Sequence, residues 1–480
     1  MPDATFVRNA MLPPQTPPRT ERGAVKWLRE NLFSGPVNSA LTVLALATLY
    51  YLISISLPWL LHSIWNADSL GECRSKIAAS FGPDAGGACW AVIRARWYQF
   101  IFGFYPPKLY WRPILDFGLL FVALTPILFS DNPRSASLLT GCVAILTIAC
   151  LALAQCPIWL FAAIAALLTG LYLLATARPT RLLALTLLYP FLTVWLLWGG
   201  SAWDPVLALV GFGIIALVYR AGSPRFGVVV ATSAGFVAAC IWWLALQSPI
   251  STALQSIAHL AIQPIDSDRF GGFLLAFVIG VSSISISLPI GIGLALGRQS
   301  DMLLIKTLAV GFIEFVRGVP LITMLFTASL LLAYFLPPNT NFDLILRVVI
   351  LVTLFSAAYN AEVVRGGLAA LPRGQYEAAD ALGLDYWQAQ RLIIMPQALK
   401  VSIPGIVSTF IGLFKDTTLV TFVGLADPLR GITTIVRADI NWKGIYWEPY
   451  IFVGLIFFLA CFGMSRYSMY LEHKLRTDHR

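Results

Sequence analysis

Residues 377–396 read EAADALGLDYWQAQRLIIMP, a polar stretch between two long apolar runs. Of the 480 residues in the chain, 58% are hydrophobic and 12% are charged. Several apolar runs are long enough to cross a bilayer core, which is about 30 Å thick. The period-two alternation that is typical of membrane β-barrels is absent. We therefore predict an all-α fold, a polytopic membrane helical bundle from which the quoted stretch emerges.

A requirement of roughly twenty apolar residues per span predicts about twelve membrane spans. Their approximate limits are 40–62, 113–130, 135–155, 157–176, 182–198, 204–219, 226–246, 271–296, 307–334, 345–366, 403–424 and 448–468. The run at 204–219 meets the requirement least well. A cleaved signal peptide would have its apolar core nearer to Met1, so we interpret 40–62 as a retained anchor.

The basic residues predict which ends of the spans face the cytoplasm. With the N-terminus inside, the intervening short outer loops hold only Arg269. The short inner loops then hold Arg134, Arg178, Arg181, Arg220, Arg225, Arg298 and Lys306. This asymmetry follows the positive-inside rule and predicts a cytoplasmic tail at 1–38 and a cytoplasmic C-terminus. It also explains the net charge of +9 without a nucleic-acid partner.

The long segment 63–112 is rich in arginine and lysine, yet this topology places it outside. Loops of this length are weak reporters of orientation. Cys73 and Cys89 lie in it and are the two cysteines outside apolar runs. Export would allow them to form a disulfide, and two unpaired thiols are the alternative. The other five cysteines show no metal-ligand spacing and are expected to be packing residues.

Composition changes along the chain. Spans between 113 and 246 contain almost no ionisable residue and are typical of a lipid-facing scaffold. From Gly271 onward, polar and charged residues occur at or within the span ends: Glu314, Arg317, Asn360, Glu362, Arg365, Lys415 and Asp416. Charges at membrane depth are costly, so they usually line a pathway or pair with one another. We expect the C-terminal half to perform the function.

The polar stretch itself predicts a helix-turn-helix. Proline and glycine at 372–374 end the preceding span. Residues 375–382 then form a short helix, which ends at Gly383 because glycine tolerates a positive φ. Asp385 caps a second helix, with the glutamine three residues later as its reciprocal partner. Pro396 is expected to end that helix near the membrane.

This stretch resembles the EAA loop of ABC-importer permeases, whose pattern is EAA, three residues, Gly, nine residues, Ile, any residue, Leu-Pro. The matching residues are Glu377, Ala378, Ala379, Gly383, Ile393 and Pro396. Met395 replaces the leucine and has a similar volume. Ala378 and Ala379 are small enough for a partner to approach the backbone, and Glu377 offers a fixed charge beside them.

The flanking sequences narrow the resemblance to permeases for polar amino acids of the histidine/glutamine type. The similar blocks are FVRGVPLI at 315–322, YNAEVVRGGL at 359–368, PRGQYEAA at 372–379, MPQALK at 395–400 and IGLFKDTTLV at 411–420. The sequence GACWAVIRARW at 87–97 is similar to a loop of the large permease subunits of general L-amino-acid importers. The likeness covers about 265–470 and 25–112, whereas 135–246 resembles no family.

The resemblance implies a five-span, MetI-like core of a type I ABC importer at 265–480, preceded by a transmembrane scaffold at 39–264. It implies a bacterial inner-membrane permease that moves L-amino acids from periplasm to cytoplasm. Its partners would be a cytoplasmic ATPase docked on the inner loop at 372–400, a second homologous permease and a periplasmic binding protein. A GxxxxGK[ST] loop is absent, so we expect no cofactor on this chain and ATP use by the partner.

For the solute path, the candidates are Arg317, Asn360 and Glu362, which would meet the carboxylate and ammonium of an amino acid. The alternative is structural ion pairing, since Glu314 and Glu362 each have an arginine three residues later. Lys415 and Asp416 are expected to tie the fourth core span to the inner loop.

Two other classes of function are weighed against this one. An ion-coupled secondary transporter would typically show internal repeats with interrupted helices, and none is visible. A membrane-embedded enzyme would need a catalytic group of residues, but the four histidines are isolated at termini or loops. We therefore expect a transporter subunit that is not an enzyme.

Overall fold

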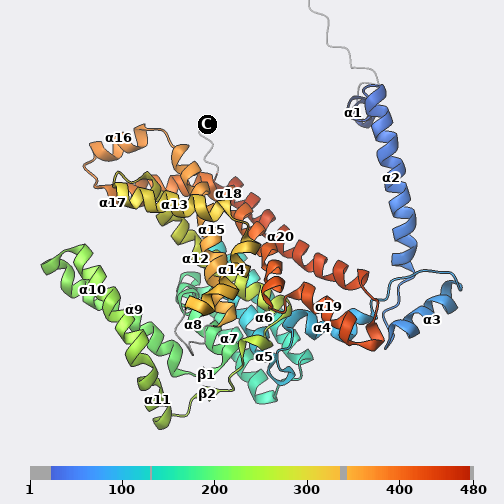
Figure 1. Cartoon of the computed structure of the whole chain (residues 1–480), viewed down its shortest axis with the longest axis horizontal. Coiled ribbons are helices and arrows are strands. Elements are labelled where there is room, and N and C mark those ends of the chain that lie inside the picture. The colour runs from blue at the N-terminus through green and yellow to red at the C-terminus, as the bar shows by residue number, and fades with distance from the viewer. Residues whose placement is uncertain (1–22, 130–131, 336–342, 476–480) are drawn as a thin grey trace, which may run out of the picture. The chain divides into compact units, whose positions relative to one another are not determined.

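The computed structural model describes residues 23–129, 132–335 and 343–475 (Figure 1). The chain divides into two compact units, Met1–Ala95 and Arg96–Arg480, and each is described by itself. Most of the cytoplasmic tail predicted at 1–38 lies outside the described residues, as do the last five residues of the C-terminal tail.

The first unit contains one membrane-length helix followed by a cysteine-containing loop. Its elements are α1 (Gly23–Asn31), α2 (Pro36–Leu61), α3 (Leu70–Phe81) and the first residues of α4 (Ala91–Phe102). Helix α2 has 26 residues, begins at a proline and corresponds to the anchor predicted at 40–62. Cys73 and Cys89 form a disulfide within this unit, with an Sγ–Sγ distance of 2.02 Å.

Polar contacts organise the start of α3. The Ser69 hydroxyl caps the helix by accepting from the backbone N–H of Glu72. The Glu72 carboxylate accepts from the backbone N–H of Asp68 at 2.8 Å and pairs with Lys76 at 2.7 Å. Together, the Asp68 N–H and the Lys76 ammonium hold the pKa of Glu72 below its usual value, because both stabilise the carboxylate.

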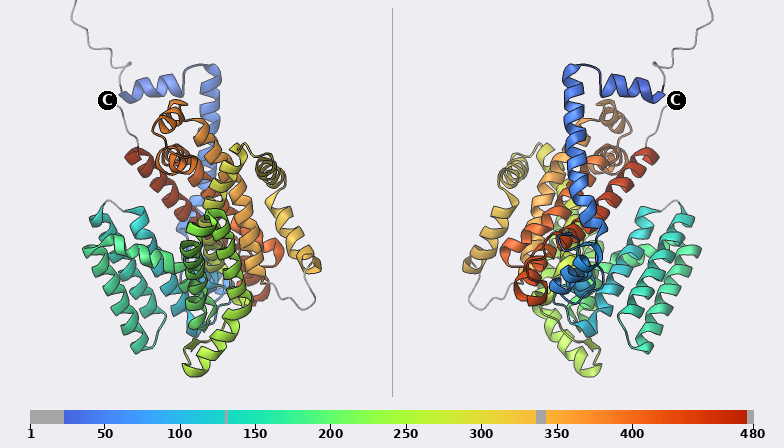
Figure 2. Two further views of the ribbon diagram at one scale, coloured as in Figure 1. Left: turned by 90° about the vertical axis from the view of Figure 1, so that its left-hand side faces the viewer. Right: turned by 90° about the vertical axis from the view of Figure 1, so that its right-hand side faces the viewer.

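The second unit begins with a group of long helices that covers the predicted scaffold. They are α5 (Trp111–Leu128), α6 (Pro133–Leu153), α7 (Ile158–Ala177), α8 (Leu183–Trp198), α9 (Trp203–Phe226), α10 (Val228–Ile241) and α11 (Gln247–Ile257). Figure 2 shows α6 and α7, in teal, side by side as an antiparallel hairpin. A π-helical turn at Trp242–Leu246 joins α10 to α11, so this span extends beyond the predicted 226–246. The short strands β1 (Gly200–Ser201) and β2 (Ala261–Ile262) pair antiparallel.

The remaining helices form the core of the second unit. They are α12 (Gly272–Gln299), α13 (Leu303–Gly318), α14 (Leu321–Phe335), α15 (Leu344–Ala369), α16 (Gly374–Ala381), α17 (Tyr386–Ala389), α18 (Met395–Asp416), α19 (Pro428–Ala438) and α20 (Trp447–Leu475). Figure 1 shows α16 and α17 at one end of this unit and the β1–β2 pair at the other. We call these the loop end and the strand end.

Within the described residues, eleven helices are long and apolar enough to span a membrane by themselves. Two further helices, joined at a bend, meet the requirement only together and would make a twelfth span. The bent pair corresponds to the span predicted at 307–334, which is not one continuous helix. Helix α13 ends at Gly318 and the next helix begins at Leu321, with a bend of 100° between them. Pro320 lies in the break and has no N–H with which to continue the helix.

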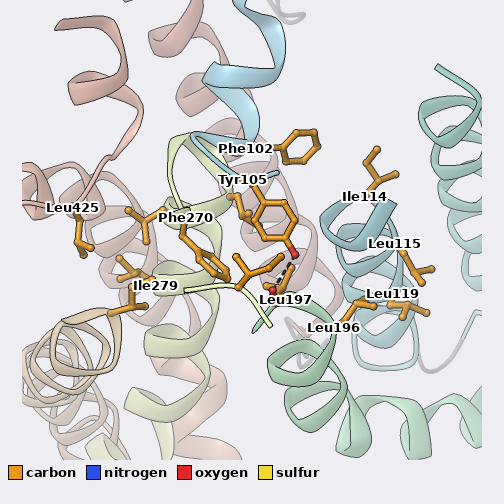
Figure 3. Close-up of a cluster of buried hydrophobic side chains, with 14 of the residues drawn as sticks. Phe102, Tyr105, Ile114, Leu115, Leu119, Leu196, Leu197, Phe270, Ile279 and Leu425 are labelled. Atoms are coloured by element: carbon orange, nitrogen blue, oxygen red, sulfur yellow. Dashed lines mark hydrogen bonds between the residues drawn. The ribbon is translucent and has the colours of Figure 1, made fainter. Parts of the chain in front are cut away.

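Near the strand end, an aromatic and aliphatic cluster joins scaffold and core helices (Figure 3). The rings of Tyr105 and Phe270 meet edge to face, 5.6 Å apart, and the Tyr105 hydroxyl donates to the Leu197 carbonyl at 2.9 Å. Gly103 has a φ of +66°, and a side chain there would overlap the backbone of Gly271. The two chain segments therefore meet backbone to backbone.

Helices α12 and α15 pack closely along a polar seam. A Cβ on Gly291 would lie only 2.8 Å from the Cβ of Asn360, so the missing side chain permits the approach. On the same interface, the Ser287 hydroxyl accepts from the Asn360 amide at 3.1 Å and is 3.2 Å from the Ser356 hydroxyl. All three side chains are buried; these contacts satisfy the Asn360 amide nitrogen, whereas Asn360 Oδ1 has no partner among the described residues.

This packing predicts a difference between two glycines of one helix. Gly291→Ala should lower the free energy of unfolding by about 1–3 kcal/mol, because the new methyl group overpacks the interface. Gly293→Ala is the control, since no atom lies within 4 Å of a Cβ at that position. Thermal unfolding of the purified protein in detergent measures both. Equal melting temperatures for the two variants would contradict the close packing.

Candidate functional site

The first element of the candidate site is α16, which begins five residues after α15 ends, close to the predicted 375–382. Gly383 has a φ of +68°, as its predicted helix-ending role requires. Its N–H donates to the Asp380 carbonyl at 2.9 Å, and the Leu384 N–H donates to the Ala379 carbonyl at 3.2 Å. These two bonds form a Schellman motif, which satisfies carbonyls at the helix end.

The second element begins with the predicted cap. The Asp385 carboxylate accepts from the Gln388 N–H at 2.8 Å, and the Gln388 side chain accepts from the Asp385 N–H at 3.1 Å. The capping box is therefore confirmed. The prediction that Pro396 ends this helix is wrong. A π-helical turn at Gln390–Ile394 leads directly into α18, whose second residue is Pro396.

Apolar packing anchors both elements on the membrane helices. Ile394 and Ala398 are fully buried in a cluster with Val364 of α15. The motif residue Ile393 packs against the same cluster from the side. The Gln397 amide also donates to the Gln375 side chain at 2.9 Å, which links α18 to α16. A displacement of the loop is therefore coupled to α15 and α18.

The solvent-exposed side of the loop carries several large apolar side chains. Leu382, Trp387 and Leu392 are 72%, 70% and 64% exposed, and the carboxylate-bearing Glu377 is exposed as well. Exposed large apolar side chains rimmed by polar groups are typical of protein interaction surfaces. The two motif alanines differ, since Ala378 is exposed whereas Ala379 is fully buried. Only Ala378 offers its small side chain to a partner.

Beneath the loop, three helices bring five charged side chains together. Glu362 is central, with its carboxylate 2.6 Å from Arg298, 3.0 Å from Arg365 and 3.7 Å from Arg317. Glu314 lies 2.9 Å from Arg298 and 3.9 Å from Arg317. Both ion pairs expected from the three-residue spacing are therefore present. The cluster holds three guanidinium groups and two carboxylates, a net charge of +1.

Sequence reasoning missed Arg298 as a member of this cluster. Arg298 lies in the last turn of α12, far along the chain from Glu314 and Glu362. The only available signal was topological, since the positive-inside pattern put Arg298 at the same end of the bundle as those acids.

Asn360 is not part of the charged cluster. It lies two residues before Glu362 and therefore on the opposite face of α15, where it is fully buried against Ser287. The structure thus brings Arg317 and Glu362 together but holds Asn360 at the α12–α15 interface.

The expectation that Lys415 and Asp416 tie a span to the inner loop is wrong. Both lie in the last turn of α18, whereas the loop joins its first turn. A helix of 22 residues rises about 33 Å, so the two side chains lie at the opposite end of the span.

Within the described residues, the membrane-length helices and the anchored, partly apolar loop at one end define a polytopic membrane protein. Residues 287–477 match the family model described as binding-protein-dependent transport system inner membrane component. The chain is 61% identical, over the full length of both chains, to a glutamate/glutamine/aspartate/asparagine transport system permease protein of Rhodobacter capsulatus. It is 33% identical to an inner membrane amino-acid ABC transporter permease protein of Escherichia coli, covering 97% of this chain and 96% of that one.

A crystal structure of an amino acid ABC transporter with histidines is also similar, with 30% identity and a TM-score of 0.38. That likeness covers 42% of this chain and 91% of the other. The chain belongs to the family of inner-membrane permease subunits of amino-acid ABC importers. Membership means that it is a transporter subunit rather than an enzyme, and that it works with a separate ATPase and a binding protein.

The Schellman motif predicts that Gly383 and Gly374 differ in their tolerance of a side chain. Gly383→Val should strain the loop by about 1–2 kcal/mol, because a β-branched residue disfavours positive φ. Gly374→Val is the matched control, since neither glycine has an atom within 4 Å of its Cβ position and only Gly383 has a positive φ. ATP-driven uptake by the reconstituted complex should fall for Gly383→Val alone. Equal uptake by both variants would contradict this role of the cap.

Proposed function

We propose that α16 and α17 are the site where the ATPase docks, and that ATP-driven movement of the ATPase reaches the membrane helices through them. The observation that carries this proposal is the exposure of Glu377, Leu382 and Trp387 on a loop that the buried Ile394 and Ala398 anchor to the bundle. Such a face is suited to a groove on a soluble partner. ATP is used by that partner, and this chain holds no cofactor.

The proposed complex contains a second, homologous permease. A single path between two permeases needs both chains, and the charged cluster of this chain supplies one wall of it. The region 39–264 is then a membrane scaffold, with an exported loop at 63–112, attached to the transport core at 265–480. The low content of ionisable residues in the scaffold spans supports this division.

The proposed orientation has both termini and the loop end in the cytoplasm. It is supported by the basic residues of the short loops and by the Cys73–Cys89 disulfide, which favours an oxidising compartment for the segment 63–112. Protease digestion of the C-terminal tail in inside-out and right-side-out vesicles tests this orientation.

For substrates, we propose amino acids with a side-chain carboxylate or amide, as in the name of the Rhodobacter capsulatus relative. The net positive cluster suits an anionic or strongly dipolar solute. Arg317 has the longest ion-pair distances in the cluster, 3.7 and 3.9 Å, so it is the guanidinium most readily recruited by a solute carboxylate. Glu362 then keeps Arg317 in place and can meet the solute ammonium. Asn360 would join this path only after rearrangement of the α12–α15 interface.

The docking proposal predicts the composition of the purified complex. Gentle detergent extraction followed by mass spectrometry should recover an ATPase and a second permease with the unaltered chain. Glu377→Lys should lose the ATPase and keep the permease, because it reverses one charge on the docking face. Asp268→Lys is the control, since Asp268 is an exposed acid that follows β2 at the strand end, away from that face. Recovery of neither partner with the unaltered chain would favour an ion-coupled secondary transporter instead.

The substrate proposal predicts different effects for the two acids of the cluster. Glu362→Gln should reduce uptake by at least about tenfold, because it removes the carboxylate that faces three guanidinium groups. Glu314→Gln should reduce uptake less, since that side chain is 52% exposed and contacts two of them. Size-exclusion chromatography of each complex separates transport from assembly. Dissociation of the Glu362→Gln complex would instead assign the cluster a structural role.

A further inference from the structure

Between the scaffold and the core lies a cleft of about 620 Å³ that the transport path does not use. Its walls come from α5, α8, α12 and α15, which all belong to membrane-length helices. The lining is mainly apolar and includes Phe117, Leu120, Val194 and Phe277. The cleft occupies the first turns of α15 and the last turns of α8, and therefore lies in the half of the bundle at the strand end.

Two carboxylates interrupt the apolar lining, and no Lys, Arg or His is among the described residues that line the cleft. Asp116 is only 4% exposed and accepts from the Thr193 hydroxyl at 2.7 Å and from the Tyr189 hydroxyl at 3.3 Å. Arg112 lies one helical turn away, but its Nη1 donates to the Gln263 carbonyl at 2.7 Å. A carboxylate has about four acceptor positions, so Asp116 can accept further hydrogen bonds.

Asp343 is the second carboxylate of the cleft. It caps α15 by accepting from the Leu346 N–H at 3.1 Å and also accepts from the Ser267 hydroxyl. The Trp198 indole donates to that same hydroxyl at 2.7 Å and lines the cleft beside Asp343. Among the residues that the structure describes, the donors to the two carboxylates are hydroxyl groups and one backbone N–H, while the nearby Arg347 donates to the Ser329 carbonyl at 3.0 Å. Acids within a bilayer are costly unless a cation compensates them, so the charge of the cleft is suited to a positively charged ligand.

The surroundings of the cleft indicate the kind of ligand. Its α12 wall runs from residue 277 to 286, and its volume of about 620 Å³ accommodates a flexible hydrocarbon chain. Since the walls are membrane spans, the chain that is available there belongs to a lipid.

We propose that this cleft binds one acyl chain of a membrane phospholipid with a primary-amine headgroup. The chain fills the apolar part between α5 and α12, and the headgroup ammonium donates to Asp116, while Asp343 adds to the negative charge of the cleft. The bound lipid fastens the scaffold to the core at the strand end. Its site is separate from the docking loop and from the charged cluster, which lie at the loop end.

Native mass spectrometry of the whole importer complex tests the proposal. The complex is delipidated and placed in nanodiscs with equal parts of phosphatidylethanolamine and phosphatidylglycerol that carry the same acyl chains. The retained lipid should be enriched in phosphatidylethanolamine by about tenfold, as expected for one charge-assisted hydrogen bond. Asp116→Asn should largely abolish that enrichment, because the amide keeps contacts to Thr193 and Tyr189 but has no charge.

A second variant tests whether the chain occupies the cleft. Ser285→Trp should lose the retained lipid, since Ser285 lines the cleft and an indole there would fill it. Thr169→Trp is the matched control, because both hydroxyls are exposed and bond to the carbonyl four residues earlier in a membrane helix. If Ser285→Trp does not assemble, the Asp116→Asn comparison still decides.

Three outcomes would overturn the proposal. They are equal retention of the two headgroups by the unaltered complex, undiminished retention by Ser285→Trp, and crosslinking of a Ser285→Cys variant to the second permease rather than to lipid. Uptake is not the readout, so failure here leaves the proposed transport function untouched.

Discussion

The close packing of α12 on α15 is the contact on which the other features of the core depend. Gly291 lets the two helices approach, and the buried Ser287–Asn360 hydrogen bond fixes their register. Because the register is fixed, Arg298 at the end of α12 meets Glu362 near the end of α15. The next segment of the chain is α16. The interface therefore positions both the charged cluster and the loop that follows it.

Features that depend on local geometry could be predicted from the sequence. The Schellman motif at Gly383 and the capping box at Asp385 each involve residues within one or two turns. Local chemistry therefore determines them. Most spans could also be predicted, because a bilayer requires a minimum length of apolar helix and that length can be read from one continuous segment. The break before Leu321 also had a local signal in Pro320, but a proline alone does not distinguish a bend within a span from two separate helices.

Features that depend on helix rotation and direction could not be predicted in this way. Asn360 and Glu362 are near neighbours in sequence but face different partners, because two residues correspond to more than half a turn of helix. Arg298 reaches the acids only through the packing of three helices. The expectation for Lys415 and Asp416 fails for a similar reason, because the direction of α18 places both residues at the end opposite the loop. The lipid-sized cleft requires four helices at once and has no signature in any one of them.

The uninterrupted run from α17 through the π-helical turn to the end of α18 has a mechanical consequence. Residues 386–416 form one continuous helix about 46 Å long, which begins next to the capped turn at Asp385. If the helix stays straight, a tilt of about 10° around the Asp385 end would carry the other end roughly 8 Å sideways. The helix would thus amplify a small rotation at the loop end, with Pro404 as a point of bending within it. The π-helical turn at Gln390–Ile394 lies close to the Asp385 end of this helix, where a change in helical winding would alter its stiffness.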